Sequence, residues 1–263
     1  MCISLGRHRA TENHPVKWCL ENYPQKKSHI SKILARINTT ISVKKNSKIL
    51  ELGCAQGLFI FALRELGYKC SFGVEPSKIA LRNMELIEKI KHEKLNIKHG
   101  YAEKIPFEDE TFDLVIAESV LEHVLEEVKV FQEVYRVLKK NGVFYFSTTS
   151  ILCPYQGEIR FFPFFSWYPD KLKKKIMNWS SLHHPDLIGN TQTPAINWYS
   201  FKKVKKLAKT YGFRIVKSRW DMVGESTSPK SVKVFVKNFL SLNSIFRFIG
   251  DILTPGSTYL LIK

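Results

Sequence analysis

Residues 48–57 read KILELGCAQG, and residues 73–77 read GVEPS. In the first stretch a short apolar run ends in Glu51 and leads into a turn of small residues, after which a helical pattern begins. About 20 residues further on, a second short run ends in another acid, Glu75. In an open α/β sheet, nucleotide-like cofactors bind at the carboxyl ends of adjacent parallel strands, so this pair of acids predicts such a site.

Short apolar runs alternate with amphipathic segments on both sides of this pair. The apolar runs predict strands at residues 48–52, 70–75, 95–99, 112–117, 143–147, 213–220 and 257–262. The amphipathic segments predict helices at residues 28–40, 57–67, 77–91, 126–138 and 200–211, with Ser77 and Ser200 as N-caps and Asn141-Gly142 as a helix stop. Because strands and helices alternate, we expect an α/β fold with a doubly wound, mostly parallel, seven-stranded sheet.

The same pattern divides the chain into four parts. They are an N-terminal extension and helix at residues 1–47, polar and irregular up to residue 27; a cofactor-binding core at 48–150; an insertion after the fifth strand at 151–199; and a C-terminal completion of the sheet at 200–263. The insertion contains FFPFFSWYP at residues 161–169 and a basic run at 171–175, with no clear period. We expect this aromatic and basic insertion to form a lid over the substrate, with contact to an anionic membrane interface or stacking on single-stranded RNA as the alternatives.

Composition sets limits on the class of protein. The 263 residues are 44% hydrophobic, which is typical of a globular chain, and the formal net charge is +17. Such a charge favours nucleic acid or anionic lipid as a partner, although a solvated lysine-rich face explains it equally. The five cysteines show no metal-ligand spacing, so no metal is expected. No stretch has the roughly 18 apolar residues of a membrane span. We expect a cytoplasmic protein, with peripheral contact to a membrane left open.

The loop chemistry separates two classes of cofactor. A dinucleotide-binding loop needs three closely spaced glycines to admit a pyrophosphate. Here only Gly53 and Gly57 are present, with Ala55 at the middle position. S-adenosylmethionine instead presents a ribose diol, for which Glu75 can accept two hydrogen bonds, and an amino-acid tail. Helix N-terminal N–H groups suit the tail carboxylate, and Glu51 suits the tail ammonium.

These segments, with residues 101–124 and 134–150, resemble the class I S-adenosylmethionine-dependent methyltransferases, and are most similar to the small-molecule subgroup that includes the ubiquinone-biosynthesis type. The resemblance implies the Rossmann-like methyltransferase fold and S-adenosyl-L-methionine as cofactor. It also implies that Ala102 and Glu103 contact the adenine and that residues after the fourth strand, Ala117 among them, line the cofactor. The expected cofactor-binding residues are therefore Glu51, Gly53, Cys54, Ala55, Gly57, Glu75, Pro76, Ala102, Glu103, Glu118 and Ser119.

Two of these positions carry a qualification. Ala55 departs from the family, where glycine is usual, and we expect it to shift the loop or weaken binding. Cys54 is expected to be a small filler. Methyl transfer is an in-line displacement in which alignment dominates, so a general base is needed only for an acceptor of high pKa.

Candidate residues for the acceptor side follow the fourth strand or lie in the insertion. His123 is the best candidate for a catalytic base, with a structural role as the alternative. His183, His184, Trp198 and Tyr199 are candidates for binding the substrate, with a solvated histidine pair and core packing as the alternatives.

The sequence thus predicts an enzyme, an S-adenosylmethionine-dependent methyltransferase that acts on an oxygen or nitrogen atom of a small or lipid-linked metabolite. An RNA-directed methyltransferase, or a non-catalytic RNA-binding module on the same fold, is the alternative. Against modification of RNA, residues 117–120 read AESV in place of an Asn/Asp-Pro-Pro-Tyr signature. A cofactor-binding protein that has lost catalysis is a third reading. The oligomeric state and the acceptor stay open.

Overall fold

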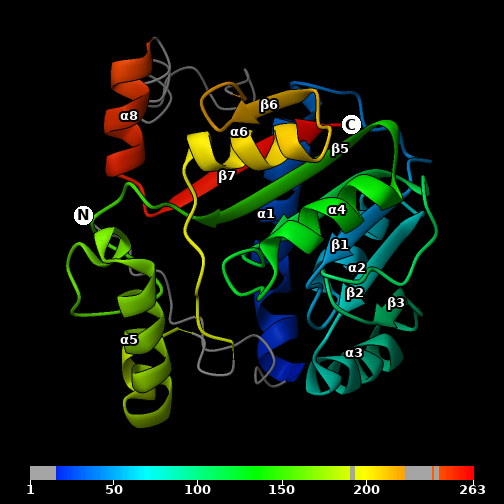
Figure 1. The fold of residues 1–263 in the computed structure, drawn as a ribbon. Coiled ribbons are helices and arrows are strands. Elements are labelled where there is room, and N and C mark those ends of the chain that lie inside the picture. Colours follow the sequence, from blue (N-terminus) through cyan, green and yellow to red (C-terminus); the bar gives the residue numbers. More distant parts are fainter. Residues whose placement is uncertain (1–15, 190–192, 223–238, 240–242) are drawn as a thin grey trace.

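The fold is built on one sheet of seven strands in the order β3-β2-β1-β4-β5-β7-β6. The computed structural model describes residues 16–189, 193–222, 239 and 243–263. The strands are β1 (Ile49–Leu52), β2 (Ser71–Glu75), β3 (Asn96–His99), β4 (Phe112–Glu118), β5 (Leu138–Thr149), β6 (Ile215–Ser218) and β7 (Gly256–Ile262). The helices are α1 (Val16–Asn38), α2 (Leu58–Glu65), α3 (Lys78–Lys91), α4 (Glu127–Val137), α5 (Asp170–His183), α6 (Phe201–Thr210) and α8 (Ser244–Ile252) (Figure 1).

The number of strands is as predicted, but their directions are not. Strands β1 to β5 pair in parallel, whereas β7 runs antiparallel to both of its neighbours, β5 and β6. The sheet is therefore mixed, and the expectation of a mostly parallel sheet was wrong. An antiparallel neighbour needs no crossover helix, so β7 can occupy the position between β5 and β6 although it follows both in the chain.

Helices cover both faces of the sheet. Helices α1, α2 and α3 share one apolar core with alternate residues of β1, β4 and β5, and helices α4 and α6 share the other core. In Figure 1, α4 and α6 lie in front of the sheet and α1 lies behind it. The N-cap predictions are confirmed, because the hydroxyl oxygens of Ser77 and Ser200 accept hydrogen bonds from the N–H groups of Ala80 and Lys203.

Strand alternation decides which side chains share the α1 face. Ile49, Leu114 and Val143 belong to the core on that face, and successive side chains of a strand point to opposite faces. By the same parity, Glu51 at the end of β1 and Glu118 at the end of β4 lie on the α1 face. Strands β2 and β4 thus end in the acids Glu75 and Glu118, Glu51 is the penultimate residue of β1, and helix α1 reaches Glu118 through His29.

Three local predictions were wrong. Helix α1 begins at Val16, well before the expected residue 28, and contains Pro24. Strand β5 begins at Leu138, so α4 ends at Val137 and Asn141 lies in the strand, with a left-handed φ of 65°. The insertion contains helix α5, which its lysine-rich sequence concealed.

The insertion carries a small core of its own. Ile159, Phe165, Met177, Ile188, Ala195 and Trp198 form this cluster, which is separate from the two main cores. Among the helices that the structure describes, none is long and apolar enough to cross a membrane.

Candidate functional site

The loop after β1 is fixed to the end of β2 by backbone hydrogen bonds. The N–H groups of Gly53 and Cys54 both donate to the carbonyl oxygen of Val74, at 2.8 and 3.2 Å. Gly53, Ala55 and Gly57 have left-handed φ angles of 66°, 47° and 74°. The glycines are required for packing as well, because a Cβ at Gly53 would lie 2.6 Å from the Val120 side chain. The loop therefore holds a fixed shape at the carboxyl edge of the sheet.

Ala55 occupies a backbone conformation that glycine prefers. A left-handed φ at a residue with a Cβ is unfavourable, which gives a physical reason for the glycine usual at this position. The conformation is held by Glu75, whose Oε2 accepts a hydrogen bond of 2.7 Å from the Ala55 N–H. The alanine thus fits the loop at the expense of backbone strain.

Glu75 ends β2 and is almost fully buried, at 4% exposure. Its second oxygen, Oε1, accepts a hydrogen bond of 2.8 Å from the Ser77 N–H. Each carboxylate oxygen has a further lone pair, so the two amides orient the group without exhausting it. The neighbouring Pro76 carbonyl lies 3.1 Å from Nε2 of His99, at the end of β3.

Glu51 is the most unusual acid of the site. Its side chain is buried, and in the described part of the chain its Oε2 has no hydrogen-bond partner. Burial raises the pKa of Glu51 well above its ordinary value, the positive charge of Lys26 opposes this, and the charges of Glu118 and Glu75 add to it. A buried carboxylate oxygen without a partner is costly unless a ligand supplies a donor. Glu51 is therefore suited to a cationic ligand.

Glu118 ends β4 and receives two polar contacts. Nε2 of His29, from α1, lies 2.5 Å from its Oε2, and the Ser147 hydroxyl donates to its Oε1 at 2.9 Å. Burial would raise the pKa of Glu118, but His29 and, more weakly, Lys26 lower it overall. Helix α1 thus brings two basic side chains to the acids at the strand ends. Sequence analysis missed Lys26 and His29. No motif around these two residues indicates that the fold brings them to Glu118, about 90 positions further along the chain.

The segment between β3 and β4 borders the same edge. The Gly100 N–H donates to the Glu75 carbonyl oxygen at 3.2 Å, and Ala102 beyond it is buried. Oε1 of Glu103 accepts a hydrogen bond of 3.1 Å from the Leu125 N–H. The segment expected to contact adenine therefore lies beside the end of β2. Cys54 is buried against Gly73, as a filler would be, and burial raises the pKa of its thiol well above the ordinary value.

A second group of titratable side chains follows β4. Glu122 is 1% exposed and its Oε2 accepts a hydrogen bond of 2.9 Å from the Thr148 hydroxyl. Burial raises the pKa of Glu122 to about 7. Glu158 from the insertion also has a raised pKa, through burial and the charge of Glu122, and His123 opposes this. His123 thus lies beside two acids that sequence analysis missed. The position of Glu122 beside His123 was the only available signal.

The insertion is tied to this turn by Asn197. Its side-chain amide donates to the carbonyl oxygens of Leu121 and Val124, at 3.0 and 2.7 Å. The N–H groups of Ile196 and Asn197 both donate to the carbonyl oxygen of Glu122, at 2.7 and 3.1 Å. The insertion is therefore anchored directly over the segment that carries His123.

The four expected substrate residues occupy two different environments. Trp198 and Tyr199 are buried; the Tyr199 hydroxyl donates to the Leu121 carbonyl oxygen, and the Trp198 indole N–H donates to Oε1 of Gln156. These contacts agree with the core-packing alternative. His183 and His184 are exposed at the end of α5, where their rings lie 6.0 and 4.8 Å from that of Trp179.

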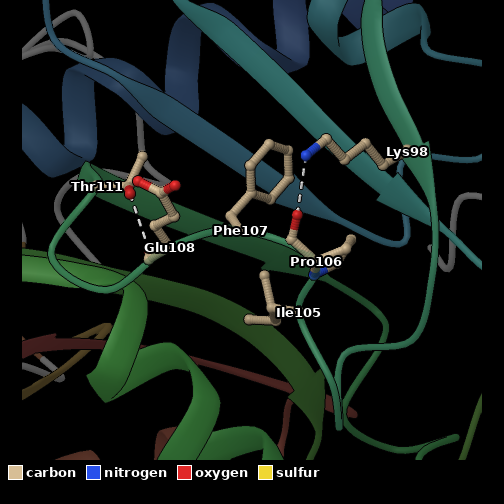
Figure 2. A pocket seen from close by; sticks show the side chains of 6 residues that line it. All are labelled: Lys98, Ile105, Pro106, Phe107, Glu108 and Thr111. Atoms are coloured by element: carbon tan, nitrogen blue, oxygen red, sulfur yellow. Dashed lines mark hydrogen bonds between the residues drawn. The ribbon is translucent and has the colours of Figure 1, made fainter.

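A surface hollow lies apart from these acids. Its lining comes from Lys98, residues 105–108 and Thr111. Figure 2 shows the Lys98 ammonium donating to the Pro106 carbonyl oxygen, and the two atoms lie 3.0 Å apart. None of the strand-end acids lines it. In the described residues, no group of three or more histidines, cysteines and acids could hold a metal ion.

Comparison with known proteins shows which proteins part of the chain resembles. Residues 50–146 match the family model of a methyltransferase domain. YrhH of Bacillus subtilis, a protein named as a methyltransferase, is 29% identical over 140 residues, which are 49% of this chain and 78% of that protein. A demethylmenaquinone methyltransferase of Geobacillus is 36% identical over 107 residues, which are 39% of this chain and 45% of that protein.

A solved structure shares the fold. Phosphoethanolamine N-methyltransferase 2 of Haemonchus contortus, in complex with S-adenosyl-L-methionine, superposes with a TM-score of 0.55 at 15% identity. The superposition covers 89% of this chain and 52% of that protein. At this level of identity the likeness concerns the fold.

Proposed function

We propose that this S-adenosylmethionine-dependent methyltransferase, whose family domain spans residues 50–146, transfers a methyl group to an oxygen or nitrogen atom of a small or lipid-linked metabolite. The observation that carries the proposal is the group of three acids at the carboxyl edge of three adjacent parallel strands. Two of them, Glu51 and Glu75, are buried, and Glu51 has an oxygen without a hydrogen-bond partner in the described chain. S-adenosylmethionine supplies an electrophilic methyl group on its sulfonium. The residues of the site bind and orient it.

Each part of the cofactor has a group of suitable chemistry. Glu75, oriented by two backbone amides, would accept hydrogen bonds from the ribose hydroxyls. Glu51 would accept a hydrogen bond from the tail ammonium, which would supply the donor that its buried Oε2 lacks. Ala102 and Glu103 would border the adenine. The same residues do not suit a pyrophosphate, because three carboxylates would repel it.

Helix α1 would close the cofactor site from the side opposite α4. Its apolar side, including Ile30 and Ile33, is buried in the core that α1 shares with α2 and α3, and this packing holds the helix against the sheet. Lys26 and His29 then counter the charges of Glu51 and Glu118. We infer that these two basic residues keep the site from being a purely anionic cavity when the zwitterionic tail binds.

The acceptor would meet the methyl group beneath the insertion. Residues 151–199 would act as the lid, which is supported by their own apolar core and by the bonds of Asn197 to the turn after β4. His123, which acts on the charge of the neighbouring Glu158, would remove a proton from an acceptor of high pKa. The remaining domain boundaries, 1–47, 48–150 and 200–263, are proposed on the same basis.

Two experiments test this function. Calorimetry should show S-adenosylmethionine binding to the folded chain, and no heat at millimolar ligand would exclude the assignment. Incubation with methyl-labelled cofactor and cell extract, fractionated into lipid, small-molecule, glycan and RNA pools, should label the lipid or small-molecule pool. Label in RNA alone would favour the other acceptor class.

The charge of +17 favours RNA as a second candidate. An RNA-directed methyltransferase or an RNA-binding module predicts affinity for RNA that falls steeply with salt. A gel shift absent at low salt, or one that does not change with salt, would exclude this candidate.

A further inference from the structure

We propose that the face formed by residues 161–182 and helix α8 docks on the surface of an anionic lipid bilayer. This inference depends on the function proposed above in one respect, namely that the membrane would carry the methyl acceptor. The docking itself is measured without methyl transfer, so the two proposals can fail separately.

Helix α8 exposes a continuous apolar stripe. Ile245, Phe248, Ile249 and Leu253 are 68%, 52%, 41% and 70% exposed. Their spacing of three, four and eight residues places them on one side of the helix. The helix is capped in the ordinary way, since the Asn243 side chain accepts hydrogen bonds from the N–H groups at the start of α8. Single apolar side chains on a surface are common, but a contiguous stripe marks an interaction site.

Helix α5 combines apolar and basic residues on its outer side. Trp179 and Leu182 are 47% and 78% exposed, and Lys171 and Lys175 are exposed on the same side. Its inner side is buried in the core of the insertion, where Met177 is 1% exposed. Lysines beside an indole and a leucine on one helix face are typical of a helix that lies in the plane of a membrane interface.

The loop before α5 holds two aromatic rings in water by means of an unfavourable backbone. Phe161 is 87% exposed at a φ of 62°, and Phe164 is 48% exposed at a φ of 60°. Left-handed backbone is rare for bulky residues and is found where function requires it. The Phe164 ring contacts that of Trp167, itself 56% exposed, at a centroid distance of 5.1 Å.

Charge decides which partner suits this face. Helices α5 and α8 both lie at the left margin of Figure 1, away from α3 and β3. The formal charge of +17 attracts an anionic surface and opposes pairing with a second copy of the same chain. Basic residues beside an apolar face gain affinity for anionic headgroups while the apolar side chains enter the acyl boundary. An anionic bilayer satisfies both kinds of group at once.

The test is co-sedimentation of the full chain with vesicles of phosphatidylcholine alone and of phosphatidylcholine with 30% phosphatidylglycerol. We expect binding to the anionic vesicles that weakens with salt. Trp179→Ser with Leu182→Ser, and Phe248→Ser with Ile249→Ser, should each lower binding at least about tenfold. Lys171→Glu with Lys175→Glu should lower it by about fivefold per lysine, on anionic vesicles only.

The control is Leu86→Ser with Ile90→Ser on α3, where the two side chains are 49% and 54% exposed on the other side of the molecule. This variant should bind vesicles as the unaltered chain does. Thermal unfolding and calorimetric binding of S-adenosylmethionine show that each variant is folded. No binding to anionic vesicles, equal loss in the control, or a dimer that the α5 and α8 variants abolish would overturn the proposal.

Discussion

The carboxylate of Glu75 fixes the loop that follows β1, because its Oε2 accepts a hydrogen bond of 2.7 Å from the backbone N–H of Ala55. Glu75 is the last residue of β2, and Ala55 lies 20 positions earlier, in the loop that follows the neighbouring parallel strand β1. One acid thus shapes the glycine loop and, with its remaining lone pairs, faces the proposed ribose. The shape of the loop and the proposed binding of the ribose therefore depend on the same side chain.

Glu75→Ala should lower the affinity for S-adenosylmethionine. Loss of a charge-assisted hydrogen bond is worth about 1.5–3 kcal/mol, or roughly 10- to 150-fold in Kd by calorimetry. Glu85→Ala, which removes an exposed carboxylate from α3, is the matched control and should bind normally. Unchanged affinity in a folded Glu75→Ala variant would show that the ribose lies elsewhere.

Ala55→Gly should stabilise the chain. The left-handed φ of 47° is unfavourable for alanine by about 1–2 kcal/mol, and the extra freedom of glycine in the unfolded chain returns about 0.4–1 kcal/mol of this. The free energy of unfolding in urea should therefore rise by about 0.5–1 kcal/mol. Ala62→Gly, within helix α2, should have the opposite sign. A destabilised Ala55→Gly variant would mean that the loop is not strained.

Glu122→Gln should change how stability depends on pH. The pKa of Glu122 is raised to about 7 in the folded protein, against about 4.3 unfolded, so folding favours its protonated form. Its contribution is fully present below the unfolded pKa and is lost as the pH rises through 7. The amide has no such titration, so Glu122→Gln should gain up to about 3 kcal/mol relative to the unaltered chain between pH 4 and 8. If the free energies of unfolding of the variant and the unaltered chain differed by the same amount at pH 4 and at pH 8, the raised pKa of Glu122 would be contradicted.

His29→Ala should act in the opposite direction through Glu118. The folded pKa of Glu118 is lowered, so its contribution is present above the unfolded value of about 4.3 and is lost as the pH falls through the folded pKa. Without His29 the pKa of Glu118 should rise, and the loss of stability between pH 5 and pH 3 should shrink. His183→Ala, which removes an exposed histidine, should leave that loss unchanged. Urea unfolding at both pH values makes the measurement.

His123→Gln should separate catalysis from binding of the cofactor. If His123 removes a proton from the acceptor, kcat should fall by about 10²- to 10⁴-fold while the Kd for S-adenosylmethionine is unchanged. The rate of the unaltered enzyme should also fall at low pH, and the variant should lose this dependence. A full kcat in the variant would assign His123 a structural role.

Sequence alone predicted the cofactor half well, because its signals are local. The apolar runs that form β1, β2 and β4 are short and bounded by turn residues, and Ser77 caps its helix as expected. The direction of β7 could not be predicted, because a strand's own residues do not encode which neighbours it pairs with. The start of α1 was hidden by polar residues and Pro24.

The candidate site divides in the same way. Glu51, Glu75 and the loop could be chosen as candidates from the sequence because they lie within two short stretches of chain. His29 and Glu158 were missed because only the tertiary fold brings them to Glu118 and to the neighbourhood of Glu122. The spacing of residues along the chain does not indicate such contacts.

The position of β7 has a consequence for synthesis. Because β7 follows β6 in the chain but lies between β5 and β6, the ribosome must release β7 before β6 can join the sheet. The half from β1 to β5 can assemble while translation continues, since N-terminal parts of a chain fold first. Until β7 emerges, the outer edge of β5 is open, and a nascent chain is exposed to strand pairing with other nascent chains. The open edge of β5 therefore needs protection from the time β5 is made until β7 emerges, after strands β1 to β5 have paired.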